Sequence, residues 1–297
     1  MSVNRFVDPR ALARIKDLDL IARTVVDGFM AGLHRSAHLG VSTDFAEHRP
    51  YMPGDDIRRV DWRLFGRTDR LYVKEFEAET NANVLALMDV SASMTYASGA
   101  VSKLDYARFL AASLVYFSAR QRDRVGVIAF DRDVVAQVPA TGRQLDTVLH
   151  TIGSVEAGQA GELETPMRRI AQGVRRRSIL ALISDLYEDP QDVRRALQRL
   201  ALRGNDVVVF HLLDPQELAF DFNEPRQFED LETGERFPVV PERLRADYRR
   251  LMAEHLDAIA GELGECRIDY CQVNTAQPLD HALFDYLSKR QRLQRVR

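Results

Sequence analysis

The feature that most constrains the fold is the regular alternation of short apolar segments with helical segments that begins at Asn83. The apolar segments have the length of β-strands: 84–90, 125–130, 134–138, 178–184, 206–212 and 266–273. Segments with helical periodicity lie between or after them: 103–120, 143–152, 166–175, 190–202, 241–262 and 279–290. Strands that are apolar along their whole length are typical of a sheet buried on both faces. We therefore predict an α/β fold, doubly wound, with a mainly parallel sheet flanked by helices.

Two regions depart from this alternation. Residues 9–33 have helical periodicity, with Asp8 able to cap the helix and Pro9 in its first turn, and a charged segment, residues 44–79, follows. Later, Glu232-Thr233-Gly234-Glu235 separates two short extended segments and predicts a surface hairpin. We expect residues 1–80 to form a helix and a loop-rich segment packed on a main domain, residues 81–297, with a hairpin insertion near 215–240.

Composition excludes some classes of protein. The chain has 41 basic and 44 acidic side chains, a formal net charge of −3, which argues against a general nucleic-acid-binding protein. No apolar run approaches the ~20 residues of a membrane span, and the N-terminal sequence has no hydrophobic signal core.

Cys266 and Cys271 are predicted on opposite faces of a strand, as free thiols. We expect a cytoplasmic protein.

Oxygen-bearing side chains cluster at the ends of the predicted strands. Asp89, Ser91 and Ser93 follow the first strand, Asp185 follows the strand 178–184, and Thr165 precedes a helix. Ligands of open α/β sheets bind beyond the carboxyl ends of the strands. Carboxylates and hydroxyls are the hard donors that Mg²⁺ prefers. The set predicts a site for Mg²⁺ or Mn²⁺, although Asp and Ser after a strand also serve as helix caps.

These residues carry a resemblance. Asp89, Ser91, Ser93, Thr165 and Asp185, in this order, resemble the metal-ion-dependent adhesion site of von Willebrand factor type A domains. The charged segment resembles the bacterial domain-of-unknown-function family 58, which couples such a segment to a type A domain. The residues that carry this second resemblance are Glu47, Arg49, Tyr51, Gly54, Asp55, Asp56, Arg58, Asp61, Trp62, Arg63 and Arg67.

The first resemblance implies roles for the site residues. Ser91, Ser93 and Thr165 would contact the cation directly, and Asp89 and Asp185 directly or through water. The family's loop before the threonine is usually glycine-rich, whereas this chain has Gly161-Glu162-Leu163-Glu164-Thr165, so Glu162 or Glu164 is an alternative ligand. A coordination position would stay open for a carboxylate of a partner protein.

A carboxylate of the same chain is a second hypothesis for that open position. The acids considered for it are Asp55 and Asp56, both in the charged segment.

The resemblance implies a metal-dependent protein–protein interaction module. Members of such families are commonly encoded beside MoxR-type AAA+ ATPases, which implies an adaptor or co-chaperone working with such an ATPase. One alternative is a Mg²⁺-dependent hydrolase or phosphotransferase that uses Asp89 as nucleophile. However, a haloacid-type phosphatase has a second aspartate where this chain has Ser91, and the chain has no phosphate-binding Gly-x-x-x-x-Gly-Lys motif. The other alternative is a structural scaffold with an empty metal site. We expect that the protein is not an enzyme.

The charged segment has two interpretations. It is either a docking surface or a set of arginine–carboxylate pairs that brace a loop-rich region. We favour bracing, in which the arginines are paired with the acids; the residues are Arg49, Arg58, Arg63, Arg67, Glu47, Asp55, Asp56 and Asp61. Trp62, the only tryptophan, is predicted to anchor the segment in the core.

Overall fold

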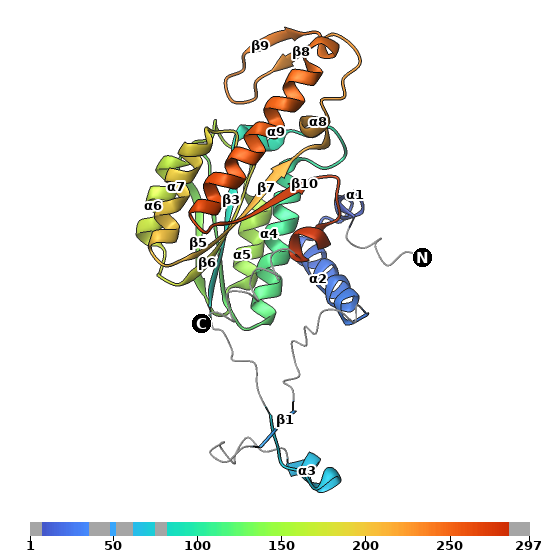
Figure 1. Ribbon diagram of the computed structural model, residues 1–297, viewed down its shortest axis with the longest axis vertical. Coiled ribbons are helices and arrows are strands. Elements are labelled where there is room, and N and C mark those ends of the chain that lie inside the picture. The colour runs from blue at the N-terminus through green and yellow to red at the C-terminus, as the bar shows by residue number, and fades with distance from the viewer. Residues whose placement is uncertain (1–7, 36–47, 52–61, 75–81, 285–297) are drawn as a thin grey trace.

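A six-stranded sheet forms the centre of the molecule (Figure 1). The computed structural model describes residues 8–35, 48–51, 62–74 and 82–284. The strand order is β10-β7-β6-β3-β4-β5, and every neighbouring pair is parallel except the antiparallel pair β4 and β5. The strands are β3 (Asn83–Asp89), β4 (Arg124–Phe130), β5 (Val134–Thr141), β6 (Ser178–Ser184), β7 (Asp206–Leu213) and β10 (Asp269–Asn274). The predicted mainly parallel α/β fold is confirmed.

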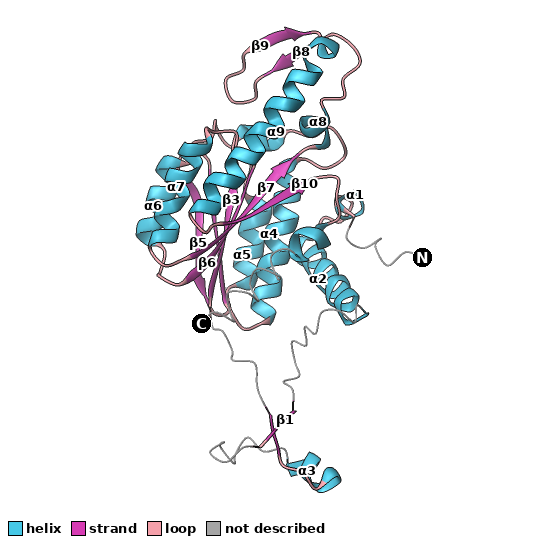
Figure 2. Ribbon diagram, viewed as in Figure 1, coloured by secondary structure: helices cyan, strands magenta, loops and turns pink. Residues whose placement is uncertain are grey.

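Helices cover both faces of this sheet (Figure 2). One face carries α2 (Leu18–Arg35), α4 (Lys103–Arg120) and α5 (Leu145–Ser154). The other carries α6 (Glu164–Gly173), α7 (Pro190–Leu202) and α9 (Pro241–Glu265). The predicted bounds of α4 and α7 match the structure, and residues 279–284 begin the expected last helix. Among the described helices, none combines the length and apolar character needed to span a membrane.

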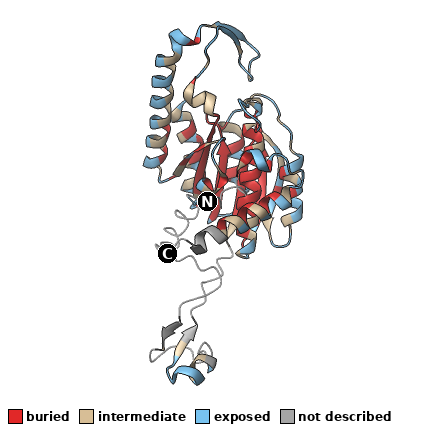
Figure 3. Cartoon of the chain, turned by 90° about the vertical axis from the view of Figure 1, so that its right-hand side faces the viewer, coloured by how far each residue is buried: buried red, intermediate tan, exposed pale blue. Residues whose placement is uncertain are grey.

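Each central strand contributes to two cores because successive side chains point to opposite faces. In β3, Val84, Ala86 and Met88 pack with α2, α4 and α5, whereas Leu85 and Leu87 pack with α6, α7 and α9. The strands are therefore buried on both faces, as Figure 3 shows, and this explains their continuously apolar sequences.

The N-terminal helix differs from its prediction. The expected helix over 9–33 is interrupted: α1 (Pro9–Leu12) ends early and α2 starts at Leu18. Asp17 explains the restart, because its carboxylate accepts hydrogen bonds from the backbone N–H groups of residues 19 and 20, as a helix cap does. Asp8 caps α1, with Pro9 in the first turn, as expected.

The described part of the charged segment is a short antiparallel pair with a helix between its strands. β1 (His48–Pro50) pairs with β2 (Tyr72–Lys74), and α3 (Trp62–Thr68) connects them. The backbone N–H of Tyr51 donates to Leu71 O at 2.9 Å, and Arg67 lies in the last turn of α3.

The prediction that Trp62 anchors this segment in the core is wrong. Its side chain is 57% exposed. It lies at the first position of a seven-residue helix, where its ring meets Phe65 edge-on at a centroid distance of 6.1 Å. Contact with Phe65, one helical turn away, covers only part of the Trp62 indole.

The bracing pairs stay a prediction. Most of the residues that they require lie outside the described residues, as do other residues of the family resemblance: Glu47, Gly54, Asp55, Asp56, Arg58 and Asp61.

The predicted hairpin is present. β8 (Arg226–Glu229) pairs antiparallel with β9 (Arg236–Val239), after the short helix α8 (Pro215–Ala219). Phe220 stacks on Tyr248 of α9 at 4.3 Å between ring centroids, and Phe228 of the hairpin stacks on Phe220 at 5.7 Å. The hairpin, residues 226–239, is thus attached through aromatic contacts to α9, while most of its own side chains are exposed (Figure 3).

The two cysteines are free thiols, as predicted. The strand expected from residue 266 begins only at Asp269, because residues 265–267 belong to the end of α9 and the turn after it. Cys266 therefore precedes the strand, and Cys271 is buried within it.

Candidate functional site

The last residue of β3 is a buried carboxylate held by two hydrogen bonds. Asp89 is 6% exposed. Its Oδ1 accepts a hydrogen bond from the backbone N–H of Ser91 at 2.9 Å, and its Oδ2 accepts one from the Ser184 hydroxyl at 2.5 Å. The hydroxyl oxygens of Ser91 and Ser93 lie 3.1 Å apart. The structure therefore brings Asp89, Ser91 and Ser93 together at the carboxyl end of the sheet, as the sequence predicts.

The surroundings of Asp89 disfavour the ionised form of its carboxyl group. Burial raises its pKa to about 7, and the negative charge of Asp185 adds to this effect. Hydrogen bonds from Ser184 and Ser91 oppose the rise. Asp89 and Asp185 are thus two buried like charges that repel each other, and a divalent cation would offset both the cost of burial and the repulsion.

Asp185 also has a cationic partner that sequence reasoning missed. Its Oδ2 accepts a hydrogen bond from Lys103 Nζ at 2.7 Å, and the same ammonium donates to Glu217 Oε1 of α8 at 2.7 Å. Lys103 is 1% exposed, and its Nζ lies 4.8 Å from the ring centroid of Tyr187. Burial favours a lower pKa for Lys103, but the charges of Asp185 and Glu217 outweigh it and raise the pKa. The one feature of the sequence that could have indicated this role is the position of Lys103, a charged residue in the first turn of a mostly apolar helix.

Thr165 belongs to a different loop from Asp89, Ser91 and Ser93, and its role as a ligand stays a prediction. It lies in the first turn of α6, and its hydroxyl donates to Glu162 Oε1 at 3.5 Å. Within the described residues, no hydrogen bond connects Thr165 with Asp89, Ser91 or Ser93. Glu164, the other alternative ligand, pairs with Arg199 of α7 at 2.6 Å. Glu162 stays a predicted alternative to Thr165.

The loop before α6 packs directly on the loop after β3. The backbone N–H of Gly158 donates to Val90 O at 2.7 Å. A Cβ at Gly161 would lie 2.9 Å from the Ser91 Cβ, closer than side-chain carbons approach. The glycine therefore allows the two loops to meet at the candidate site.

The hairpin supplies a carboxylate to the same place. Glu232 Oε1 accepts a hydrogen bond from the backbone N–H of Ser93 at 2.9 Å, and its Oε2 accepts one from the backbone N–H of Gly161 at 2.7 Å. The sequence places Glu232 in a turn and indicates no role for it. Asp55 and Asp56, the acids considered for the open coordination position of the cation, lie outside the described residues.

A buried histidine supports the site from β7. His211 is 0% exposed; its Nε2 lies 2.7 Å from Asp185 O and its Nδ1 lies 2.9 Å from the Tyr270 hydroxyl oxygen. Burial lowers its pKa to about 4, so the ring is neutral near pH 7. The neutral ring satisfies both contacts when Nε2–H donates to Asp185 O and Nδ1 accepts from the tyrosine, which holds the backbone of Asp185 in place.

The donor set fits a hard divalent cation rather than a soft one. In the described parts of the chain, no three histidine, cysteine, aspartate or glutamate side chains converge as a metal-binding group. The candidate site instead combines two carboxylates with two serine hydroxyls. Such oxygen donors suit Mg²⁺, which retains several water ligands.

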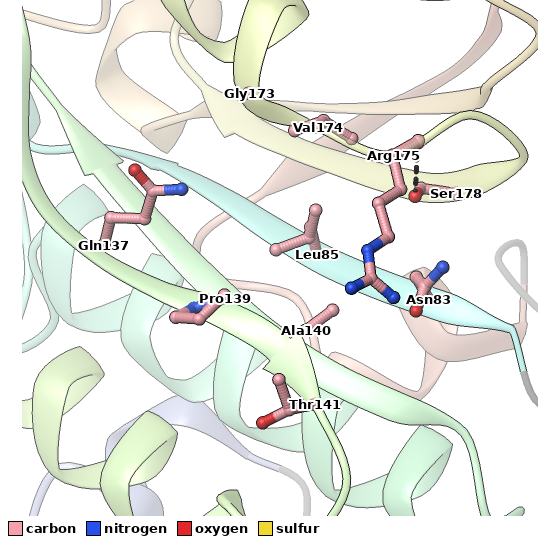
Figure 4. Close-up of a pocket in the computed structure, with 10 residues that line it drawn as sticks. All are labelled: Asn83, Leu85, Gln137, Pro139, Ala140, Thr141, Gly173, Val174, Arg175 and Ser178. Carbon is pink, nitrogen blue, oxygen red and sulfur yellow. Dashed lines mark hydrogen bonds between the residues drawn. The ribbon is translucent and has the colours of Figure 1, made fainter.

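A separate cavity lies at the other end of the sheet (Figure 4). Its volume is about 100 Å³, and its lining includes Asn83 and Ser178, the first residues of β3 and β6. Figure 4 shows the Arg175 side chain extending toward Asn83, while the Ser178 hydroxyl donates to Arg175 O at 2.8 Å. This cavity contains none of the predicted site residues.

The chain resembles known sequences over most of its length. Residues 47–258 match the family described as "Protein of unknown function DUF58". Uncharacterized proteins of Mycobacterium tuberculosis and Mycobacterium bovis are each 30% identical over 266 residues, which is 87% of this chain and 83% of theirs.

Solved structures show weaker similarity. BatB from Bacteroides thetaiotaomicron is 19% identical with a TM-score of 0.48, over 70% of this chain and 98% of that one. The SpRpn10 VWA domain is 11% identical with a TM-score of 0.42, over 68% of this chain and 93% of that one.

Proposed function

The chain belongs to the DUF58 family, and from this membership we propose that it is a protein-interaction module that binds a partner's carboxylate through a divalent cation. The observation that carries the proposal is the buried pair Asp89 and Asp185 beside two serine hydroxyls, at the carboxyl end of the sheet. This arrangement supports the resemblance to the adhesion site of type A domains.

Mg²⁺, or Mn²⁺, would be held by Asp89, Ser91 and Ser93. Asp185 keeps one oxygen on Lys103 and would contribute through its other oxygen. The bound cation would supply positive charge to attract an acidic side chain of the partner. The chain's own groups do the positioning: Ser184 orients Asp89, and His211 holds the backbone at Asp185.

The proposed partner is a MoxR-type AAA+ ATPase, for which the protein would act as an adaptor or co-chaperone. This part of the proposal rests on the family resemblance alone. Affinity purification from the source cell, with Mg²⁺ and with chelator, tests it: the ATPase should be recovered with Mg²⁺ and lost with chelator or in Asp89→Ala. Equal recovery in all three samples contradicts a metal-dependent contact.

A hydrolase or phosphotransferase with Asp89 as nucleophile is less well supported. The Asp89 side chain is buried, and both of its oxygens accept hydrogen bonds of 2.9 Å or less. An attacking carboxylate must reach its substrate directly, and burial of Asp89 works against such an approach, so the geometry favours a role in binding.

Metal binding is tested by calorimetry with Mg²⁺ alone. Wild-type protein should bind about one equivalent and unfold at a higher temperature, because a ligand at 100 times its dissociation constant stabilises the folded state by about 2.7 kcal/mol. Asp89→Ala should abolish both effects, whereas Asp146→Ala, a change at an exposed position of α5, should leave them intact. Absence of binding to the wild-type protein leaves the scaffold alternative as the better description.

A further inference from the structure

Two loops direct backbone N–H groups at one carboxylate. Ser93 N lies 2.9 Å from Glu232 Oε1, and Gly161 N lies 2.7 Å from Glu232 Oε2. Each oxygen thus has its own donor, and the donors come from the two loops that border Asp89. Hydrogen bonds from N–H groups to an ionised carboxylate are about twice as strong as neutral ones. The paired donors therefore form a binding position for a carboxylate, and in this structure Glu232 fills it.

The turn of the hairpin presents Glu232 through its own hydrogen bonds. Asp230 Oδ1 accepts hydrogen bonds from the backbone N–H groups of Glu232 at 2.8 Å and Thr233 at 3.2 Å. Gly234 takes a φ of 74°, a conformation that favours glycine, and its N–H donates to Asp230 O at 2.7 Å. The turn is thus ordered without help from the site, so Glu232 reaches the loops with little further loss of conformational freedom.

The carboxylate lies at the edge of the candidate cation site. Ser93, which donates to Glu232, has its hydroxyl 3.1 Å from that of Ser91, and the Ser91 N–H is bonded to Asp89. Gly161 approaches Ser91 from the other loop. An acidic side chain from a partner protein would have to approach this same edge, where the two N–H groups are already taken.

We propose that the N–H groups of Ser93 and Gly161 bind the aspartate or glutamate of a partner, and that Glu232 is an internal ligand which this partner must displace. The proposal rests on the proposed function for the identity of the partner's carboxylate. The contact with Glu232 itself requires no metal. Binding of a partner therefore detaches the turn of the hairpin from the two loops, while the aromatic contacts of Phe220 and Phe228 keep its base attached.

Hydrogen exchange in the full-length protein with chelator present tests the internal contact. In Glu232→Ala, the segments 91–95 and 159–163 should exchange on the order of tenfold faster than in wild-type protein, because the amides lose their acceptor. Glu235→Ala is the matched control, since it removes an exposed carboxylate from the same turn, and its exchange should equal that of the wild-type protein. Equal exchange in all three proteins contradicts the internal contact.

Acetate is the probe for the binding position. In Glu232→Ala, acetate should shift the NMR signals of the Ser93 and Gly161 amides at concentrations about tenfold lower than in wild-type or Glu235→Ala protein, because no internal ligand competes. Sodium chloride at equal ionic strength should not shift them. Equal acetate affinity in the three proteins, or no shift in Glu232→Ala, overturns the proposal.

Repeating the titration with Mg²⁺ separates the two proposals. Tighter acetate binding with Mg²⁺ supports both the cation site and the carboxylate position. Acetate binding to Glu232→Ala that is the same with Mg²⁺ and with chelator supports the carboxylate position and contradicts metal dependence.

Discussion

Among single residues, Lys103 carries the positive charge that neutralises Asp185, the residue that follows β6. Its side chain is 1% exposed, and its ammonium forms ion pairs with both Asp185 and Glu217. Taking charges out of water is costly, and mutual attraction offsets the cost only while each charge keeps its partner. Glu217 also accepts a hydrogen bond from the backbone N–H of Asp214 at 2.8 Å, which connects the ion pairs to the start of α8.

Lys103→Met should therefore destabilise the protein by about 3–5 kcal/mol, because it leaves the buried Asp185 and the partly buried Glu217 without their counter-charge. Urea unfolding monitored by circular dichroism measures this. Lys16→Met, at an exposed position, should change the stability by less than about 0.5 kcal/mol. Lys103→Met combined with Glu217→Gln should recover part of the loss. If Lys103→Met alone is as stable as the wild-type protein, the ion pairs of Lys103 contribute nothing to the free energy of unfolding.

Asp89 gives the metal-free protein a characteristic pH dependence. Its pKa rises from 3.8 to about 7 on folding, so the folded state binds more protons than the unfolded state between these values. The stability that this proton contributes is fully present below about pH 4 and is lost as the pH rises through 7. His211, with a pKa lowered to about 4, acts in the opposite direction: its contribution is present above about pH 6.5 and is lost as the pH falls.

Comparison with Asp89→Asn isolates the carboxyl group, because His211 is the same in both proteins. From pH 5 to pH 8, with chelator, the wild-type free energy of unfolding should fall by about 3 kcal/mol relative to that of the variant. Urea titrations at pH 5, 6, 7 and 8 provide the measurement. Parallel stability curves for the two proteins would show that Asp89 ionises normally.

At the scale of elements, the edge pair β4 and β5 depends on one glycine. A Cβ at Gly126 would lie 2.5 Å from Val138 O and 2.7 Å from Ala140 N, both backbone atoms. The register of the β4–β5 pair shifts between Val125 and Val127, which marks an irregularity of the pairing at this point. A glycine in a strand often marks such a close approach of another backbone.

Gly126→Ala should cost about 1–3 kcal/mol, because the added methyl group forces the two backbones apart. Gly173→Ala, in α6 with no atom within 4 Å of the added carbon, should be neutral or stabilising by up to about 1 kcal/mol. Urea unfolding compares the two variants, and hydrogen exchange locates the effect in β5. Equal stability of both variants contradicts the steric argument.

At the scale of the whole molecule, the N-terminal helix belongs to the core of the α/β domain. Val25 and Val26 of α2 are 0% exposed and lie in the same core cluster as β3, α4 and α5. Ala22 of α2 also packs with Ala112 of α4 and Leu149 of α5. A boundary near residue 80 therefore separates two segments of the sequence that share one hydrophobic core. We expect α2 and the sheet to unfold together.

Val26→Asp tests this coupling. A buried, unpaired carboxylate should destabilise the whole domain by more than about 3 kcal/mol, with the sheet and helices lost in one transition. Leu20→Asp, at a position that is 48% exposed in the same helix, should leave the stability close to that of the wild-type protein. Retention of a folded sheet after α2 detaches, seen as a second transition, contradicts a shared core.

Most of the succession of strands and helices along the chain, and the place of the Asp89 cluster after β3, could be predicted from the sequence. Hydrophobic periodicity is a local property, so the bounds of α4, β6 and α7 follow from it. The contact between Asp89 and Ser91 is also local, because it closes within one loop after a strand. The break before α2 was missed since a single capping residue, Asp17, outweighs a continuous apolar pattern.

Which charges meet at the candidate site could not be predicted, because these contacts join distant parts of the chain. Lys103 reaches Asp185 across 82 residues of sequence and Glu217 across 114, and Ser93 reaches Glu232 across 139. The chain holds 44 acidic residues, and no local pattern distinguishes Glu217 and Glu232 from the rest. Their meeting depends on how strands, helices and the hairpin pack together, because charge–charge contacts follow distance in space rather than distance along the chain.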